Sequence, residues 1–130
     1  MKKWIVLAAV LLLLTGCAAQ KAADYEIVVV PAQWSEELDR RIKDHVKDRQ
    51  ELNVYQNMAQ EPDARYQALL LQDLMAQGVD AVCLEPLDDS LVTIAAEELE
   101  QAGILVVTGE DHLAMIDRAA RELEQQKPVS

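Results

Sequence analysis

The chain has 130 residues, of which 51% are hydrophobic and 27% charged, and its formal net charge is −11 at pH 7. This size suits one compact domain with a modest core and is too small for two. The acidity argues against nucleic acid or an anionic membrane surface as the partner, because their phosphate groups carry the same sign of charge.

Residues 1–16 have the pattern of an export signal. Two lysines form a basic start, residues 4–14 are apolar, and the sequence Leu-Thr-Gly precedes Cys17. The apolar run is too short to cross a bilayer as a permanent helix. A cysteine at this place resembles the bacterial lipobox, in which the thiol receives diacylglycerol and becomes the first residue of the mature protein. We therefore expect an exported protein, lipid-anchored through Cys17 on the extracytoplasmic side of the cell membrane. The alternative is an ordinary signal peptide with an incidental cysteine.

The next segments are a tether, a strand and a helix. Residues 17–24 are mostly small and polar, which is typical of a tether, and residues 25–127 form the predicted domain. Residues 26–30 are a β-branched run that ends before Pro31, and they predict a strand buried on both faces. Residues 35–50 change period, because apolar side chains recur every four residues among charges. They predict an amphipathic helix capped by Ser35.

The same alternation continues through the rest of the chain. Gly78 is expected at a helix C-cap, and Ser90 at a helix N-cap. The predicted strands are 52–56, 79–84 and 104–108, and the predicted helices are 62–77, 90–102 and 112–126.

Successive β-α units predict an α/β fold, because each crossover carries its helix back over a parallel sheet. We expect a three-layer sandwich of Rossmann- or flavodoxin-like type, with a four-stranded parallel sheet in the order 2-1-3-4 and flanking helices. In this order the strand 104–108 lies at an edge, and it contains no lysine or proline that would discourage pairing. Self-association or a partner protein is expected to cover this edge; the alternative is that helix 112–126 folds over it.

Ligands of open parallel sheets bind beyond the carboxyl ends of the strands, so the loops there supply the candidate site. The candidate ligand-binding residues are Gln33, Trp34, Asn57, Asp88, Glu110 and Asp111. One aromatic face and several hydrogen-bond acceptors suit a sugar, whose ring stacks and whose hydroxyls donate. Alternatively, Trp34 covers the end of the sheet or of a helix, and the acidic residues complement helix N-termini.

Catalysis is not expected. A Gly-rich phosphate loop after the first strand, a Gly-x-Ser-x-Gly elbow and a nucleophile beside a base are all missing from the sequence. His45 and His112 lie far apart in charged stretches, where a solvated position is expected, and no metal site or other cofactor is predicted. Cys83 lies in an apolar run and is expected to be a small buried residue.

Three segments resemble the sugar-type, type I periplasmic binding proteins that feed ABC transporters. They are Gln-Gly-Val-Asp-Ala-Val at 77–82, Glu-Pro-Leu-Asp at 85–88 and Gln-Ala-Gly-Ile-Leu-Val-Val at 101–107. The spacing between them is also similar, and the resemblance covers residues 25–111. It implies part of the N-terminal lobe of that fold, with ligand contacts from Gln33 and Trp34 in the first loop and from Glu110 in the last.

The chain also departs from the family. Members commonly place a basic residue after the acidic one, whereas Asp111 stands here, and the first loop is shortened. A full member has a second lobe that closes over the ligand. The resemblance therefore implies a single-lobe solute-binding lipoprotein, a weak or accessory sugar binder that works with a transporter permease. The alternative is an interaction module, or a truncated remnant, that pairs through its sheet edge.

The lipid anchor gives the first prediction. Cys17→Ala removes the thiol that would be acylated, so in a bacterial host the variant should lose both palmitate labelling and partitioning into a detergent phase. Cys83→Ala is the matched control and should keep both. Equal labelling of wild type and Cys17→Ala would contradict the lipoprotein interpretation.

Overall fold

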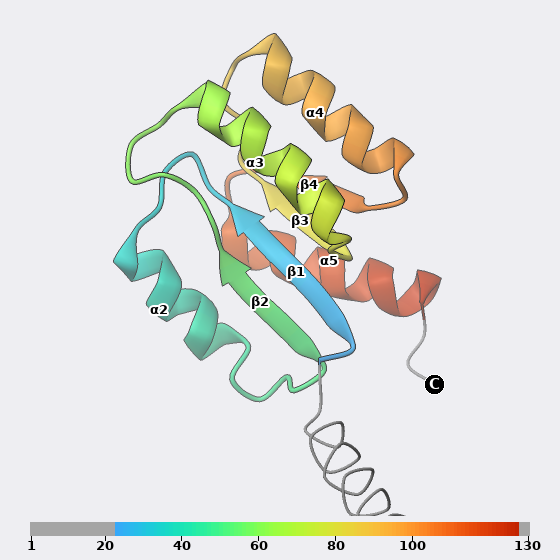
Figure 1. The fold of residues 1–130 in the computed structure, drawn as a ribbon. Helices are drawn as coiled ribbons and strands as arrows, with labels where there is room; N and C mark the ends of the chain where they lie inside the picture. Colours follow the sequence, from blue (N-terminus) through green and yellow to red (C-terminus); the bar gives the residue numbers. More distant parts are fainter. Residues whose placement is uncertain (1–22, 128–130) are drawn as a thin grey trace, which may run out of the picture.

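The computed structural model describes residues 23–127 and folds them into alternating strands and helices (Figure 1). The strands are β1 (Tyr25–Val30), β2 (Leu52–Gln56), β3 (Ala81–Leu84) and β4 (Leu105–Thr108). Neighbouring strands run parallel, and their order is β2-β1-β3-β4. The predicted fold class and strand order are therefore confirmed. Cys17 and the predicted leader lie outside the described residues.

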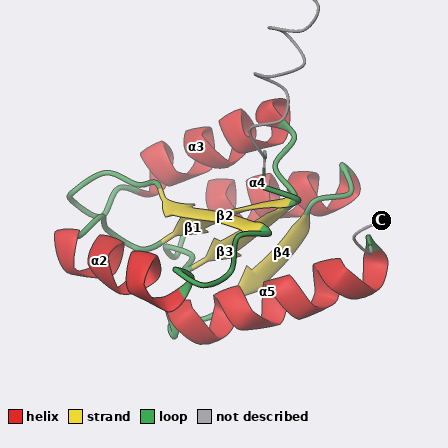
Figure 2. Ribbon diagram, turned by 90° about the horizontal axis from the view of Figure 1, so that it is seen from below, coloured by secondary structure: helices red, strands yellow, loops and turns green. Residues whose placement is uncertain are grey.

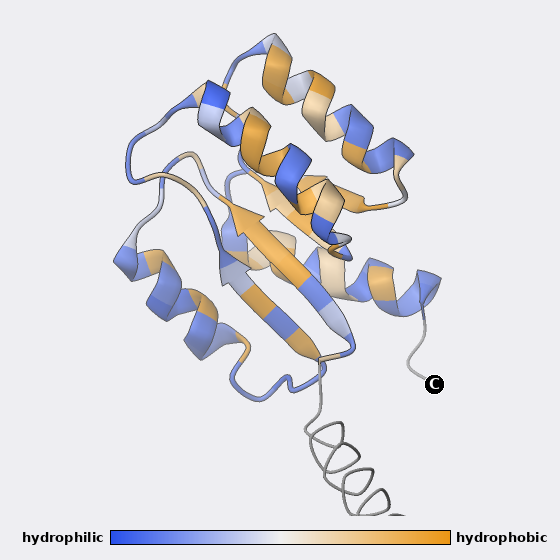
Figure 3. Cartoon of the chain, in the orientation of Figure 1, coloured by the Kyte–Doolittle hydropathy of each residue, from blue (hydrophilic) through white to orange (hydrophobic). Residues whose placement is uncertain are grey.

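The two central strands form the core of the domain. Residues 27–30 of β1 and all of β3 are fully buried, and Figure 3 shows β1 as a mainly hydrophobic strand between the helices. The register places Val29 beside Gln56 on one side and Cys83 on the other. Burial raises the pKa of the Cys83 thiol to about 12. Cys83 is thus the small buried residue that the sequence predicted.

Helices cover both faces of the sheet (Figure 2). α2 (Glu36–His45) and α5 (His112–Gln126) pack on the face to which Ile27 and Val29 contribute. α3 (Ala64–Gln77) and α4 (Ser90–Gln101) pack on the opposite face with Val28 and Val30. This alternation along β1 is the period of a strand, and it produces the three layers. None of the described helices is long and apolar enough to cross a bilayer.

Local signals set several of the helix boundaries. The Ser35 hydroxyl accepts the Leu38 N–H at 3.1 Å, which confirms the predicted cap of α2. Gly78 ends α3 with φ of 72°, a left-handed conformation that glycine adopts without steric cost, and confirms the predicted C-cap. α3 begins at Ala64 rather than at Pro62, because the side chain of Asp63 caps it.

Further boundaries differ from the prediction, and β3 begins at Ala81 rather than at residue 79. α2 ends at His45 rather than at residue 50, because a turn returns the chain to β2, with the Arg49 N–H donating to the Val46 carbonyl at 2.9 Å. The predicted cap Ser90 is instead the first residue of α4. Asp89 caps this helix, and its carboxylate accepts the Leu91 N–H at 2.8 Å.

α5 lies against the face of the sheet, where Ile116 and Leu123 are buried in the same cluster as Val107 of β4. The alternative that this helix folds over the edge is therefore wrong, since its apolar stripe is used on the face. Within residues 23–127, β4 pairs with β3 alone, and Leu105 and Val106 are half-buried there. Covering of this edge by a second copy or a partner stays a prediction.

Candidate functional site

The carboxyl ends of the parallel strands meet at one edge of the sheet (Figure 1). Two adjoining hollows lie there, and they share Ala32, in the loop after β1, and Glu85, directly after β3. This is the edge at which open parallel sheets bind their ligands.

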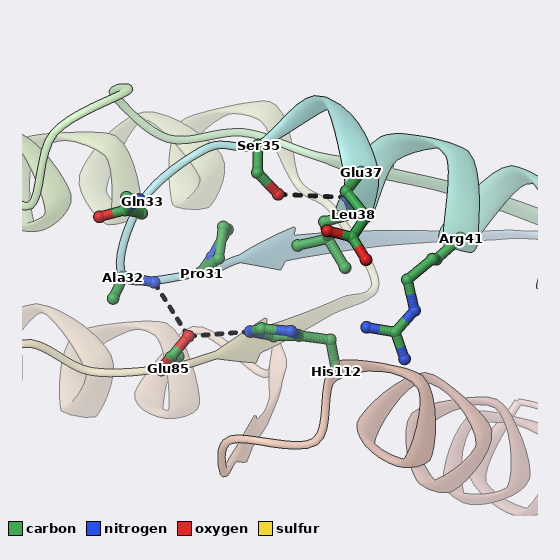
Figure 4. A pocket seen from close by; sticks show the side chains of 9 residues that line it. All are labelled: Pro31, Ala32, Gln33, Ser35, Glu37, Leu38, Arg41, Glu85 and His112. Atoms are coloured by element: carbon green, nitrogen blue, oxygen red, sulfur yellow. Dashed lines mark hydrogen bonds and ion pairs between the residues drawn. The ribbon is translucent and has the colours of Figure 1, made fainter.

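The first hollow has a volume of about 400 Å³ and lies between the loop after β1, the start of α2 and the start of α5 (Figure 4). Charged groups and a histidine dominate its wall, and it contains no tryptophan or tyrosine. The lining residues are Pro31, Ala32, Gln33, Ser35, Glu37, Leu38, Arg41, Glu85 and His112.

The second hollow has a volume of about 470 Å³ and lies between the loops after β3 and β4. Its ionisable groups are carboxylates only, so it offers acceptors to hydroxyl or ammonium donors. The lining residues are Ala32, Glu85, Pro86, Leu87, Asp88, Thr108, Gly109 and Glu110.

Glu85 joins three parts of this edge. Its Oε1 accepts the Ala32 N–H at 3.1 Å and lies 2.8 Å from Nε2 of His112 (Figure 4). The two side chains are 29% and 19% exposed, respectively, so water reaches the pair only in part. Hydrogen bonds to an ionised acceptor are stronger than neutral ones. The carboxylate therefore holds the loop after β1 and the start of α5 against the end of β3.

Gln67 on α3 fixes the same loops from inside the domain. Its side chain is fully buried, and its Nε2 donates to the carbonyls of Glu85 at 3.0 Å and Pro31 at 3.4 Å. Its Oε1 accepts the Leu87 N–H at 2.9 Å. A buried amide without partners costs free energy, so the loops after β1 and β3 are held where these bonds are made.

Gln56, the last residue of β2, does the same for the start of α2. Its side chain is buried, its Nε2 donates to the Ser35 carbonyl, and its Oε1 accepts the Ser35 N–H at 3.4 Å. Both backbone groups of the helix cap are thus tied to the neighbouring strand. The first hollow is therefore bounded by backbone whose position the core determines.

The hollows bring together half of the predicted site residues. Gln33 lines the first hollow, and Asp88 and Glu110 line the second. Trp34, Asn57 and Asp111 line neither. Trp34 is half-buried against the core on the α3 and α4 side, Asn57 extends the β1–β2 pairing through its N–H, and Asp111 caps α5. For Trp34 and Asp111 these are the alternative positions that the sequence left open; their contacts with a ligand stay a prediction.

Four ionisable lining residues were missing from the predicted set: Glu37, Arg41, Glu85 and His112. The expected solvated position of His112 is wrong, because the side chain is largely covered and bonded to Glu85. His45 is paired as well, with Asp117 of α5 at 2.9 Å. One signal was available for His112: it begins the helix that follows the last strand, where the carboxyl-edge rule places ligand contacts.

No protein-family model matches the sequence, and no protein of curated function matches it. Solved solute-binding proteins do share its fold. LsrB from Clostridium saccharobutylicum, in complex with AI-2, matches with a TM-score of 0.57 and 20% identity over 64% of this chain and 26% of its own. An ABC transporter solute-binding protein from Burkholderia graminis, in complex with D-arabinose, matches with a TM-score of 0.57 and 17% identity over 81% and 43% of the two chains. One from Bacillus halodurans with bound myo-inositol has a TM-score of 0.56 and 18% identity over 74% and 35%.

These matches establish the architecture. The four-stranded sheet with its flanking helices has the fold of half a type I periplasmic binding protein, as the sequence resemblance implied. The chain spans between 26% and 43% of the length of these three proteins.

Gln67 gives the prediction for this edge. Gln67→Leu keeps the volume but leaves the Leu87 N–H and two carbonyls without their buried partner, so the free energy of unfolding should fall by about 2–3 kcal/mol. Gln72→Leu changes an exposed glutamine of the same helix and should cost less than about 0.5 kcal/mol. Urea unfolding measures both. Equal stability of the two variants would contradict the role given to Gln67.

Proposed function

We propose that this chain is a lipid-anchored solute-binding module that takes a small polyhydroxylated ligand, such as a sugar, at the carboxyl edge of its sheet. The observation that carries the proposal is that this chain has both the fold of solved solute-binding proteins and open hollows at the edge where such a fold binds ligands. Solved proteins with this fold hold D-arabinose or myo-inositol, and here two hollows open at the edge where such a fold binds ligands.

The chemistry of the hollows supports a hydroxylated ligand. Asp88 and Glu110 are exposed acceptors in the second hollow, and Glu37 is an exposed acceptor in the first. Each can accept hydrogen bonds from hydroxyl groups without the cost of a buried charge. Within residues 23–127, no cluster of His, Cys, Asp or Glu could hold a metal ion, and the Ser35 hydroxyl that lines the first hollow is engaged as the cap of α2. A binding role therefore fits these residues better than a catalytic one.

The affinity of the two hollows alone for a sugar is expected to be low. Small-molecule sites bury about 70–90% of the ligand surface, and the two hollows face solvent on their outer side. We therefore expect a sugar to bind the described residues with a dissociation constant of about 1 mM, which corresponds to a binding free energy of roughly −4 kcal/mol. An accessory role beside an ABC transporter permease, with Cys17 carrying the membrane anchor, agrees with such weak capture.

A second candidate function is protein interaction through the sheet edge. β4 reads Leu-Val-Val-Thr, has one neighbour among the described strands, and carries no lysine or proline. Edges of this kind pair with other strands, so a second copy or a partner protein could extend the sheet there. This function needs no small ligand.

Calorimetric titration of the full chain in a mild detergent tests the proposal, with D-arabinose, D-allose and myo-inositol as ligands. At least one should bind in the millimolar range, and Glu110→Gln should weaken that binding threefold or more, because it replaces one acceptor oxygen in the second hollow with an NH2 donor and removes the charge. Glu97→Gln, an exposed acid of α4 that lines neither hollow, is the control and should leave binding unchanged. No binding of any of these ligands, together with sedimentation as a dimer, would favour the second function.

A further inference from the structure

The first hollow carries charged groups that a neutral sugar would not require. Glu37 and Arg41 face it from α2, and Glu85 and His112 close it from the opposite side (Figure 4). Trp34, the tryptophan available for ring stacking, lies outside it, against the core. Recognition in this hollow therefore does not use stacking on Trp34, and it relies on charge and hydrogen bonds beside the apolar contacts of Pro31, Ala32 and Leu38.

Arg41 is the cation whose charge is available to a ligand. It is exposed and makes no ion pair with another residue of the described chain, although acids outnumber bases 23 to 12 in the sequence. Arg40, Arg65 and Arg121 also lack an ion pair within residues 23–127, but none of them lines either hollow. Lys43 on the same helix pairs with Asp39 at 2.9 Å. Figure 4 shows the Arg41 guanidinium extending from α2 toward the α5 side of the hollow, where His112 lies. A guanidinium in this position offers parallel donors to an incoming carboxylate.

The two acidic residues of the first hollow, Glu85 and Glu37, differ in how many partners their carboxylates have within the protein. Oε1 of Glu85 already accepts the Ala32 N–H and contacts His112, so part of its charge is offset within the protein. Glu37 lies one turn before Arg41, is exposed, and makes no ion pair within residues 23–127. Its carboxylate is free to accept hydroxyl donors. The hollow thus presents the paired N–H donors of Arg41 next to the Glu37 carboxylate, which can accept hydrogen bonds from hydroxyls.

We propose that the solute of this site is a sugar acid, a monoanion in which one carboxylate accompanies several hydroxyls, and that Arg41 determines this specificity. Arg41 binds the carboxylate in bidentate fashion, and Glu37 accepts from a neighbouring hydroxyl. A phosphorylated sugar fits less well, because its nearly double negative charge would meet Glu37 and Glu85 in a protein of net charge −11. This inference rests on the proposed solute-binding function and narrows its ligand class.

The test compares D-glucuronate with D-glucose by calorimetric titration of the full chain in detergent at 0.15 M salt, where long-range attraction is screened within about 8 Å. Wild type should bind D-glucuronate at least tenfold more tightly than D-glucose. Arg41→Gln should remove this preference by weakening D-glucuronate binding about tenfold. Arg41→Lys should keep part of this preference, since an ammonium group retains the positive charge but cannot donate two parallel hydrogen bonds to a carboxylate.

Arg40→Gln is the matched control, because it removes the same charge from the adjacent exposed position of α2, which does not line the hollow. It should leave the preference unchanged. Equal loss in Arg40→Gln and Arg41→Gln would overturn the role of Arg41. Binding of D-glucose as tight as that of D-glucuronate would overturn the sugar-acid class while the solute-binding proposal stands. If neither these two ligands nor the neutral sugars bind, both proposals fail.

Discussion

A buried amide must have its hydrogen bonds made inside the protein, and this constraint on Gln67 organises the carboxyl edge of the sheet. The side chain reaches from α3 to the backbone of Pro31, Glu85 and Leu87. Two loops that leave neighbouring strands are thereby held at fixed positions relative to one helix. The free energy at stake is about 1–3 kcal/mol for each group left unpaired, which is a large fraction of the stability of a small domain.

Glu85 extends this arrangement outward. Its backbone carbonyl is held by Gln67, while its carboxylate bonds the Ala32 N–H and contacts His112. Glu85 lines both hollows, so its bond to the buried Gln67 fixes part of the wall of each. A site built in this way is preorganised, and a weakly bound solute need not supply the free energy of ordering its loops.

The fold could be predicted from the sequence because its signals are local. A β-branched run such as that of β1, a cap such as Ser35 and a glycine such as Gly78 each act on their own few residues, and the order of elements then restricts the topology. The C-terminal end of α2 and the start of α3 were less predictable, because periodicity alone does not show which of several nearby residues forms the turn or the cap.

The candidate site could be predicted only in part, because its contacts join residues far apart in sequence. The loop rule selected Gln33, Asp88 and Glu110, which do line the hollows. It could not show that Trp34 packs against the core, or that His112 meets Glu85 from 27 positions away. Gln67 gave no signal at all, since a glutamine of an amphipathic helix usually faces water.

The central claim is that buried side-chain bonds fix the loops of this edge before any ligand arrives. Amide hydrogen exchange of the full chain tests it most directly at Leu87, a loop residue whose N–H donates to Gln67. If these bonds fix the loop, the Leu87 amide should be protected about as strongly as that of Val82 in the central strand β3, and far more strongly than that of the exposed Glu110. Exchange of Leu87 as fast as that of Glu110 would contradict it.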